Sequence, residues 1–87
     1  METRIGRVTH YFAHLEVAGV CVEAEGLKVG DTIRIAGHTT DFTQEVSSMQ
    51  LEHASIREAK VGEEIGLRVV ERVREHDVVS RILPEKE

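Results

Sequence analysis

The sequence predicts an all-β fold, a small closed or nearly closed antiparallel β-barrel of about six strands. Two matched turns are the main reason. Lys-Val-Gly followed by an acidic residue occurs at residues 28–31 and again at 60–63, each time ahead of an alternating apolar run. Glycine supplies the backbone freedom of a tight turn, and the neighbouring carboxylate can accept a hydrogen bond from a free amide. The chain also has only three aromatic residues, so Val, Ile and Leu must build its core, as suits a pleated sheet.

Six extended segments follow one another along the chain. They are expected at residues 5–12, 16–23, 32–36, 42–52, 65–69 and 77–82. The alternation is clearest at 32–36, where Ile33 and Ile35 share one face. Gly19 predicts a bulge or a point of close backbone approach in the second segment. A bulge near Ser47 and Ser48 would bring Val46 into phase with Met49.

Helix is expected in one short turn at most, at residues 54–60, with Ile56 pointing inward. A helix can also be drawn over residues 63–82, because Ile65, Val69 and Val73 recur at helical spacing. Gly66 and the β-branched Val69 and Val70 are poor helix formers, so sheet is favoured there.

The length of 87 residues predicts a single domain, 1–87, with an ordered core over about 4–82 and a frayed tail at 83–87. One cysteine, no apolar leader and no long apolar stretch predict a soluble protein in the cytoplasm. The formal net charge is −5. That charge disfavours RNA and DNA as partners, although a local basic patch stays open.

No metal, cofactor or catalytic group is expected. The five histidines lie in separate segments without the spacing of zinc ligands. Cys21 stands between two valines and is expected to fill the core rather than to act as a nucleophile.

Several segments together resemble a known family. They are Ile5–Val8, Leu27–Ile35, Val46–Gln50, Ala59–Leu67 and Arg74–Val79. In order and spacing they resemble domain 2 of the translational GTPases, the β-barrel that follows the nucleotide-binding domain in elongation factor Tu. Gly26 and Gly30 are followed by Asp31 and not by Lys-Ser/Thr, so no P-loop is present and neither GTP binding nor GTPase activity is expected.

The resemblance also suggests contact residues. In elongation factor Tu this barrel helps to hold the 3′ end of aminoacyl-tRNA, and the corresponding positions here are Gln50, Glu52 and Glu64. The two glutamates add negative charge where RNA would approach, and the plainer interpretation is that all three are ordinary exposed strand and turn residues. A second candidate is the loop with Thr39, Thr40 and Phe42, in which Phe42 would anchor a partner unless the segment simply builds a turn.

The function expected from these observations is a non-catalytic binding module in translation or RNA metabolism. Its partner would be a protein or a ribonucleoprotein, with tRNA or rRNA disfavoured by charge and no role at DNA or a membrane. The alternative is an accessory or structural subunit acting in trans with a separately encoded enzyme.

Overall fold

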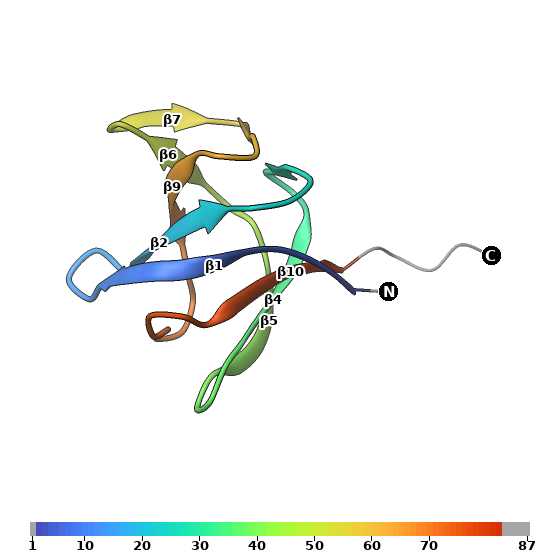
Figure 1. The fold of residues 1–87 in the computed structure, drawn as a ribbon. Helices are drawn as coiled ribbons and strands as arrows, with labels where there is room; N and C mark the ends of the chain where they lie inside the picture. The colour runs from blue at the N-terminus through green and yellow to red at the C-terminus, as the bar shows by residue number, and fades with distance from the viewer. Residues whose placement is uncertain (1, 83–87) are drawn as a thin grey trace.

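The computed structural model of the chain describes residues 2–82, and the expectation for the tail at 83–87 falls outside them. Every regular element in this range is a strand, so the all-β prediction is confirmed (Figure 1). The strands are β1 (Glu2–Phe12), β2 (Val17–Val22), β3 (Leu27–Lys28), β4 (Thr32–Ala36), β5 (Asp41–Glu45), β6 (Met49–Leu51), β7 (Ala54–Ile56), β8 (Glu58–Ala59), β9 (Glu64–Arg68) and β10 (Val78–Ile82).

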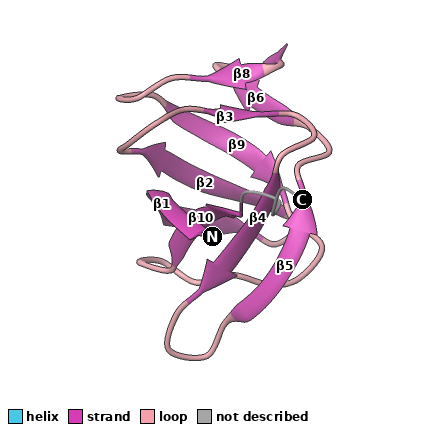
Figure 2. Cartoon of the chain, turned by 90° about the vertical axis from the view of Figure 1, so that its right-hand side faces the viewer, coloured by secondary structure: helices cyan, strands magenta, loops and turns pink. Residues whose placement is uncertain are grey.

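Eight strands form one antiparallel sheet in the order β5-β4-β10-β1-β2-β9-β6-β7. Figure 1 shows this order as a stack, with the β6–β7 hairpin at the top and the β4–β5 hairpin at the bottom. The short strands β3 and β8 pair separately and lie near β6 and β9 in Figure 2. The sheet brings the two described ends of the chain together, because Glu2 on β1 lies opposite Ile82 on β10.

Aliphatic side chains fill the core, as the low aromatic content predicts. Strand alternation sends one face of each long strand inward, so that Ile33 and Ile35 of β4 are fully buried while their neighbours are not. Tyr11 and Phe42 are only partly buried and pack against this cluster from outside. Its largest fully buried side chains are Ile5, Leu27, Ile33, Ile35, Met49 and Leu67.

The two predicted turns are present, and a third turn of the same construction precedes β10. In each, the amide of the fourth residue donates to the carbonyl of the first at 3.0–3.1 Å, and its carboxylate accepts from the first amide at 2.9 Å. The third residue has a positive φ in every case, which a turn of type II requires. The three turns are Lys28–Asp31, Lys60–Glu63 and Arg74–Asp77. The third escaped sequence analysis because His76, with φ 76°, occupies the glycine position.

Each turn is also locked to a buried valine on a neighbouring segment. The third residue donates its amide to the valine carbonyl, and the valine amide donates to the carbonyl of the acidic residue, all at 2.8–2.9 Å. These valines are at most 1% exposed. The reciprocal pairs are Gly30 and Asp31 with Val46, Gly62 and Glu63 with Val22, and His76 and Asp77 with Val8. These reciprocal hydrogen bonds fix where β4, β9 and β10 begin.

The prediction of a helical turn at residues 54–60 is wrong. Glu52 and His53 both have positive φ, 52° and 69°, and turn the chain into a tight hairpin that makes β7 the partner of β6. Glu58 and Ala59 then pair with β3. Strand pairing, rather than a local helix, therefore provides the backbone hydrogen bonds of this segment.

At Gly19 the expected bulge in β2 is absent, but a close approach of β1 is present. The shift opposite Gly19 lies in β1, between Val8 and His10, and not in β2. A Cβ on Gly19 would stand 3.0 Å from Thr9 Oγ1, so the missing side chain makes room for the bulged residue. The segment expected as one bulged strand over residues 42–52 is interrupted, because β5 ends at Glu45 and β6 begins at Met49.

Candidate functional site

The structure brings two of the sequence-predicted contact residues onto one face. Gln50 of β6 lies opposite Gly66 of β9, and Glu64 precedes Gly66 by two positions on the same strand. Both side chains are exposed, and the Glu64 carboxylate accepts a 2.7 Å hydrogen bond from the Thr9 hydroxyl. Glu52 stands apart from them, in the turn that joins β6 to β7.

The outer surface between β2 and β9 is depressed, because two glycines face each other there and no side chain projects from either. Gly19 and Gly66 are register partners. Beside Gly66 is a hollow of about 230 Å³ into which Gln50 projects from β6. The other residues lining it are Leu15, Val17, Ser48 and Arg68. Leu15 is 64% exposed, so this hollow has an apolar rim.

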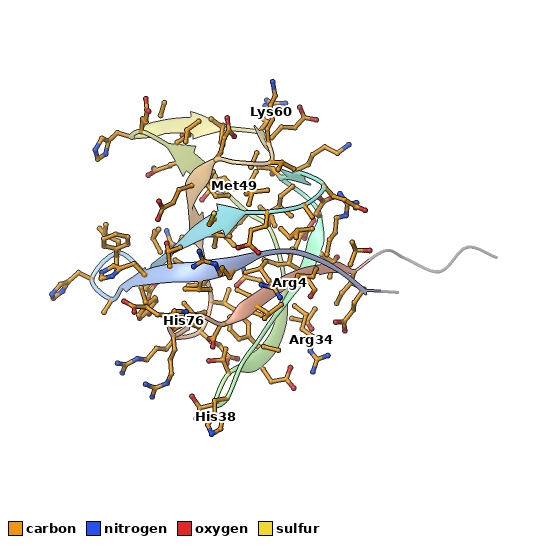
Figure 3. All side chains as sticks on the ribbon, viewed as in Figure 1. Arg4, Arg34, His38, Met49, Lys60 and His76 are labelled. Atoms are coloured by element: carbon orange, nitrogen blue, oxygen red, sulfur yellow. The ribbon has the colours of Figure 1, made fainter. Side chains whose placement is uncertain are left out.

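The second predicted site lies elsewhere in the molecule. Thr40 is buried, and its carbonyl accepts the Gly37 amide at 2.7 Å. Phe42 is half-buried and packs against the core, which leaves less of its ring for a partner. Figure 3 shows His38, at the tip of the β4–β5 hairpin, at the opposite end of the molecule from Lys60. Thr39, Thr40 and Phe42 therefore do not join Gln50 and Glu64 in one site.

An ion-pair network covers the outer face of β4. The Arg34 guanidinium contacts both carboxylate oxygens of Asp41, at 2.8 and 2.9 Å, and reaches Glu2 at 3.1 Å. The hydrogen bond from Arg34 lowers the pKa of Asp41 below its ordinary value of 3.8, and the two carboxylates raise the pKa of Arg34. These charges satisfy one another, so the network is a structural feature of the sheet surface.

Within residues 2–82 no group of three or more His, Cys, Asp or Glu side chains is arranged to hold a metal ion. The expectation that Cys21 fills the core is wrong. Strand alternation places it on the outer side of β2, where it is half-buried, with Arg7 and Glu64 as register partners.

A larger groove was missed by sequence analysis. Its volume is about 900 Å³, and three chain segments meet there: the turn after β3, the link from β5 to β6, and the bend from β7 to β8. The lining combines two basic side chains, three hydroxyls and an apolar floor. The residues are Lys28, Val29, Ser47, Ser48, Met49, Ser55, Ile56, Arg57 and Glu58. The sequence predicts a bulge near Ser47 and Ser48 and a helical turn at residues 54–60, and neither expectation brings these segments together.

Basic side chains gather around this groove, although the protein is acidic overall. A second hollow of about 380 Å³ shares Lys28 and Glu58 with it and adds Lys60 and Arg81. Arg81 pairs with Glu25 and lies 3.9 Å from Asp31. Among residues 2–82, neither Lys28, Arg57 nor Lys60 forms an ion pair. We call Lys28, Arg57, Lys60 and Arg81 the basic pole.

Comparison with known proteins identifies relatives among peptidases. The chain is 42% identical over 76 residues to the uncharacterized protease MJ0090 of Methanocaldococcus jannaschii, which covers 86% of this chain and 18% of that protein. It is 35% identical over 81 residues to a collagenase of Porphyromonas gingivalis, covering 92% of this chain and 22% of that protein. The chain thus spans about a fifth of the length of these curated relatives. No protein-family model matches it.

Solved structures agree on the fold. The crystal structure described as the "C-terminal domain of Geobacillus thermoleovorans putative U32 peptidase" superposes with a TM-score of 0.83 at 16% identity, covering 91% of each chain. Its selenomethionine variant gives 0.82 at 18% identity, over 87% of this chain and 95% of that one. At such identities the likeness concerns the fold alone.

The curated relatives are called a protease and a collagenase, and the solved structures share the fold of this chain. The resemblance to domain 2 of the translational GTPases is therefore wrong as a statement of family, and so is the translation-related binding module inferred from it. The expectation that the protein is not an enzyme is likewise contradicted, by relatives that are called a protease and a collagenase. Concerning the membrane, the described part of the chain contains no helix long and apolar enough to cross a bilayer.

Proposed function

We propose that this chain is the β domain of a peptidase of the U32 type and serves the hydrolysis of peptide bonds in polypeptide substrates. The single observation that carries the proposal is 42% identity to a protease over 86% of the chain. A collagenase aligned over 92% of the chain supports it. Because the chain corresponds to about a fifth of these relatives, it is expected to act together with a peptidase region matching the remainder.

The contribution that we infer for the β domain is to bind the polypeptide. Two hollows open on its surface beside exposed strands, and β7 ends the sheet with one edge that no strand of residues 2–82 covers. An open sheet edge offers backbone groups to an extended peptide, and neighbouring pockets take its side chains. Gln50 and Glu64, on the outer face of β6 and β9, stay candidate contacts in this role. Glu52, Thr39, Thr40 and Phe42 are weaker candidates because they lie apart from both hollows.

We also infer that the sheet closes into a barrel within a single domain of residues 1–87. In support of closure, β5 and β6 are consecutive in the chain yet pair with β4 and β9, which lie far apart in the strand order. The side chain of Gln44 spans the remaining gap: its amide nitrogen donates to the Arg68 carbonyl and its oxygen accepts from the Val70 amide, both at 2.9 Å. A single cysteine suits a reducing compartment, and we propose a cytoplasmic location.

Native material can test the assignment to a peptidase. Protein carrying this chain is captured from its source cells with an antibody against residues 1–87, and its polypeptides are identified by mass spectrometry. A peptidase region similar to the remaining four-fifths of the relatives is expected, on the same polypeptide or in a stoichiometric complex with it. Capture of the chain with no such region, under conditions that preserve complexes, contradicts the proposal.

A further inference from the structure

We propose that the groove beside β7 binds an acidic, extended segment of a polypeptide. This inference rests on the proposed function, since it names the class of substrate segment that the β domain would hold. The groove has the volume of a binding site, about 900 Å³, and it is open to the surface. Lys28, Arg57 and the serines that line it all present hydrogen-bond donors.

Charge is the first argument for an acidic occupant. The chain carries a formal charge of −5, yet both lysines within residues 2–82 lie in the basic pole. Most other arginines of the described part are neutralised by carboxylates, as Arg34 is by Asp41 and Glu2. Lys28 and Arg57 have no such partner within residues 2–82, and Glu58 is the one acidic residue lining the groove. A carboxylate entering the groove would therefore meet positive charge that the described residues leave largely uncompensated.

The shape and lining of the groove are the second argument. Ser47, Ser48 and Ser55 provide hydroxyls, while Val29 and Ile56 provide apolar surface. Alternate side chains of an extended peptide point to opposite sides, so acidic side chains could contact the groove while the backbone follows the strand. β7 offers such a strand, because it pairs with β6 on one side and ends the sheet on the other.

A nucleic acid fits the same groove less well. Single-stranded RNA and DNA gain much of their affinity from bases stacked on aromatic rings, and none of the nine lining residues is aromatic. The net charge of the chain also opposes the phosphate backbone at longer range. A carboxylate-bearing peptide needs neither stacking nor an extended basic surface.

The test measures peptide binding to the 87-residue chain by calorimetry at low salt. The probe is an end-blocked peptide of about eight residues, roughly 26 Å long when extended, in which Glu and Asp alternate with Gly and Ala. The neutral control peptide has Gln and Asn at the acidic positions. We expect the acidic peptide to bind, the neutral peptide to bind much more weakly, and the difference to shrink as salt rises.

Matched variants locate the site. Lys28→Gln with Arg57→Gln should weaken binding of the acidic peptide roughly tenfold, since two charged donors are lost. The control is Arg72→Gln with Arg74→Gln, which removes the same charge from exposed arginines on the segment between β9 and β10. That control should change affinity less than about twofold. Lys28→Arg with Arg57→Lys should restore binding, and urea unfolding checks that every variant is folded.

Four results would overturn the proposal: no binding of the acidic peptide, equal binding of the neutral peptide, equal losses in the two glutamine pairs, or tighter binding of a single-stranded RNA that displaces the peptide. The outcome of this peptide-binding test can be distinguished from the outcome of the test of the proposed function. Groove binding is measured on this chain alone, whereas the peptidase assignment depends on the region found with it. Peptide binding without a peptidase partner would refute only the proposed function.

Discussion

The backbone of His76 adopts the conformation that Gly30 adopts in the matching turn, with φ of 76° against 100°. Both amides donate to a buried valine carbonyl, at 2.8 Å to Val8 and 2.9 Å to Val46. The histidine therefore performs the backbone role of a glycine while carrying a Cβ in the left-handed region. That conformation costs an ordinary residue about 1–2 kcal/mol relative to the right-handed one.

Replacing His76 by glycine should stabilise the protein. His76→Gly relieves the left-handed strain and keeps the amide, so the free energy of unfolding in urea should rise by about 0.5–1 kcal/mol. Gly30→Ala is the matched opposite change. Nothing lies within 4 Å of a Cβ at Gly30, so the new methyl group meets no clash. The free energy of unfolding of the Gly30→Ala protein should therefore fall by about 1 kcal/mol, because of the backbone conformation alone. A destabilised His76→Gly protein would show that the imidazole contributes more than its backbone costs.

Removing the carboxylate of the third turn should be costly. Asp77 is 3% exposed, and its Oδ2 accepts the Arg74 amide at 2.9 Å. Asp77→Ala leaves that amide without its acceptor, and the free energy of unfolding should fall by about 1–3 kcal/mol. Asp77→Asn keeps an acceptor oxygen at the same position and should lose less. Equal losses in the two variants, measured by urea unfolding, would mean that the hydrogen bond does not stabilise the turn.

The Gln44 side chain should hold β5 against the segment after β9. Gln44→Leu removes its hydrogen bonds to Arg68 and Val70, and a longer one to the Glu45 carbonyl, at nearly unchanged volume. We expect the free energy of unfolding to fall by about 1–2 kcal/mol. The Val70 amide loses its acceptor, so its hydrogen exchange should accelerate more than that of amides in β1 and β2. Unchanged protection of Val70 in a folded Gln44→Leu protein would contradict the proposed closure of the barrel at this point.

The contribution of the Arg34–Asp41 ion pair to stability should be lost in acid and kept in base. The pKa of Asp41 is lowered, so its contribution to stability is fully present above the unfolded value of 3.8 and is lost as pH falls through the lower folded value. Titration followed by NMR of the Asp41 carboxyl should give a midpoint below 3.8. In Arg34→Gln the midpoint should move back toward 3.8. A midpoint at or above that value in the native protein would mean that the ion pair does not form in solution.

Strands were predictable where the residue pattern fits a strand and no other regular structure. Ile33 and Ile35 alternate with Thr32, Arg34 and the small Ala36, so β4 was placed at its observed bounds. The turns at Gly30 and Gly62 were predictable because glycine marks a positive φ. The turn at His76 was not, because a positive φ is uncommon in residues other than glycine and a histidine does not mark it. Strands β7 and β8 were missed because three-residue and two-residue strands leave no periodicity to read.

The candidate site was less predictable than the fold. The groove joins Lys28, Ser47 and Arg57 from three segments, and its existence depends on how the β6–β7 hairpin bends toward β3. No local pattern specifies that approach. The family was misjudged for a related reason: a Gly-acid turn before an alternating strand meets the physical needs of many small sheets. Its recurrence indicates a shared architecture and not a shared function.

The most direct measurement is peptide-bond cleavage by native protein captured through this chain. Heat-denatured collagen is the probe, a mock capture is the control, and new amino termini are counted over time. If the chain is the β domain of a U32-type peptidase, the captured protein cleaves the probe, and antibody depletion of the chain removes that activity from the extract. Captured protein that is intact and folded but releases no new termini from this or other unfolded polypeptides would contradict the assignment.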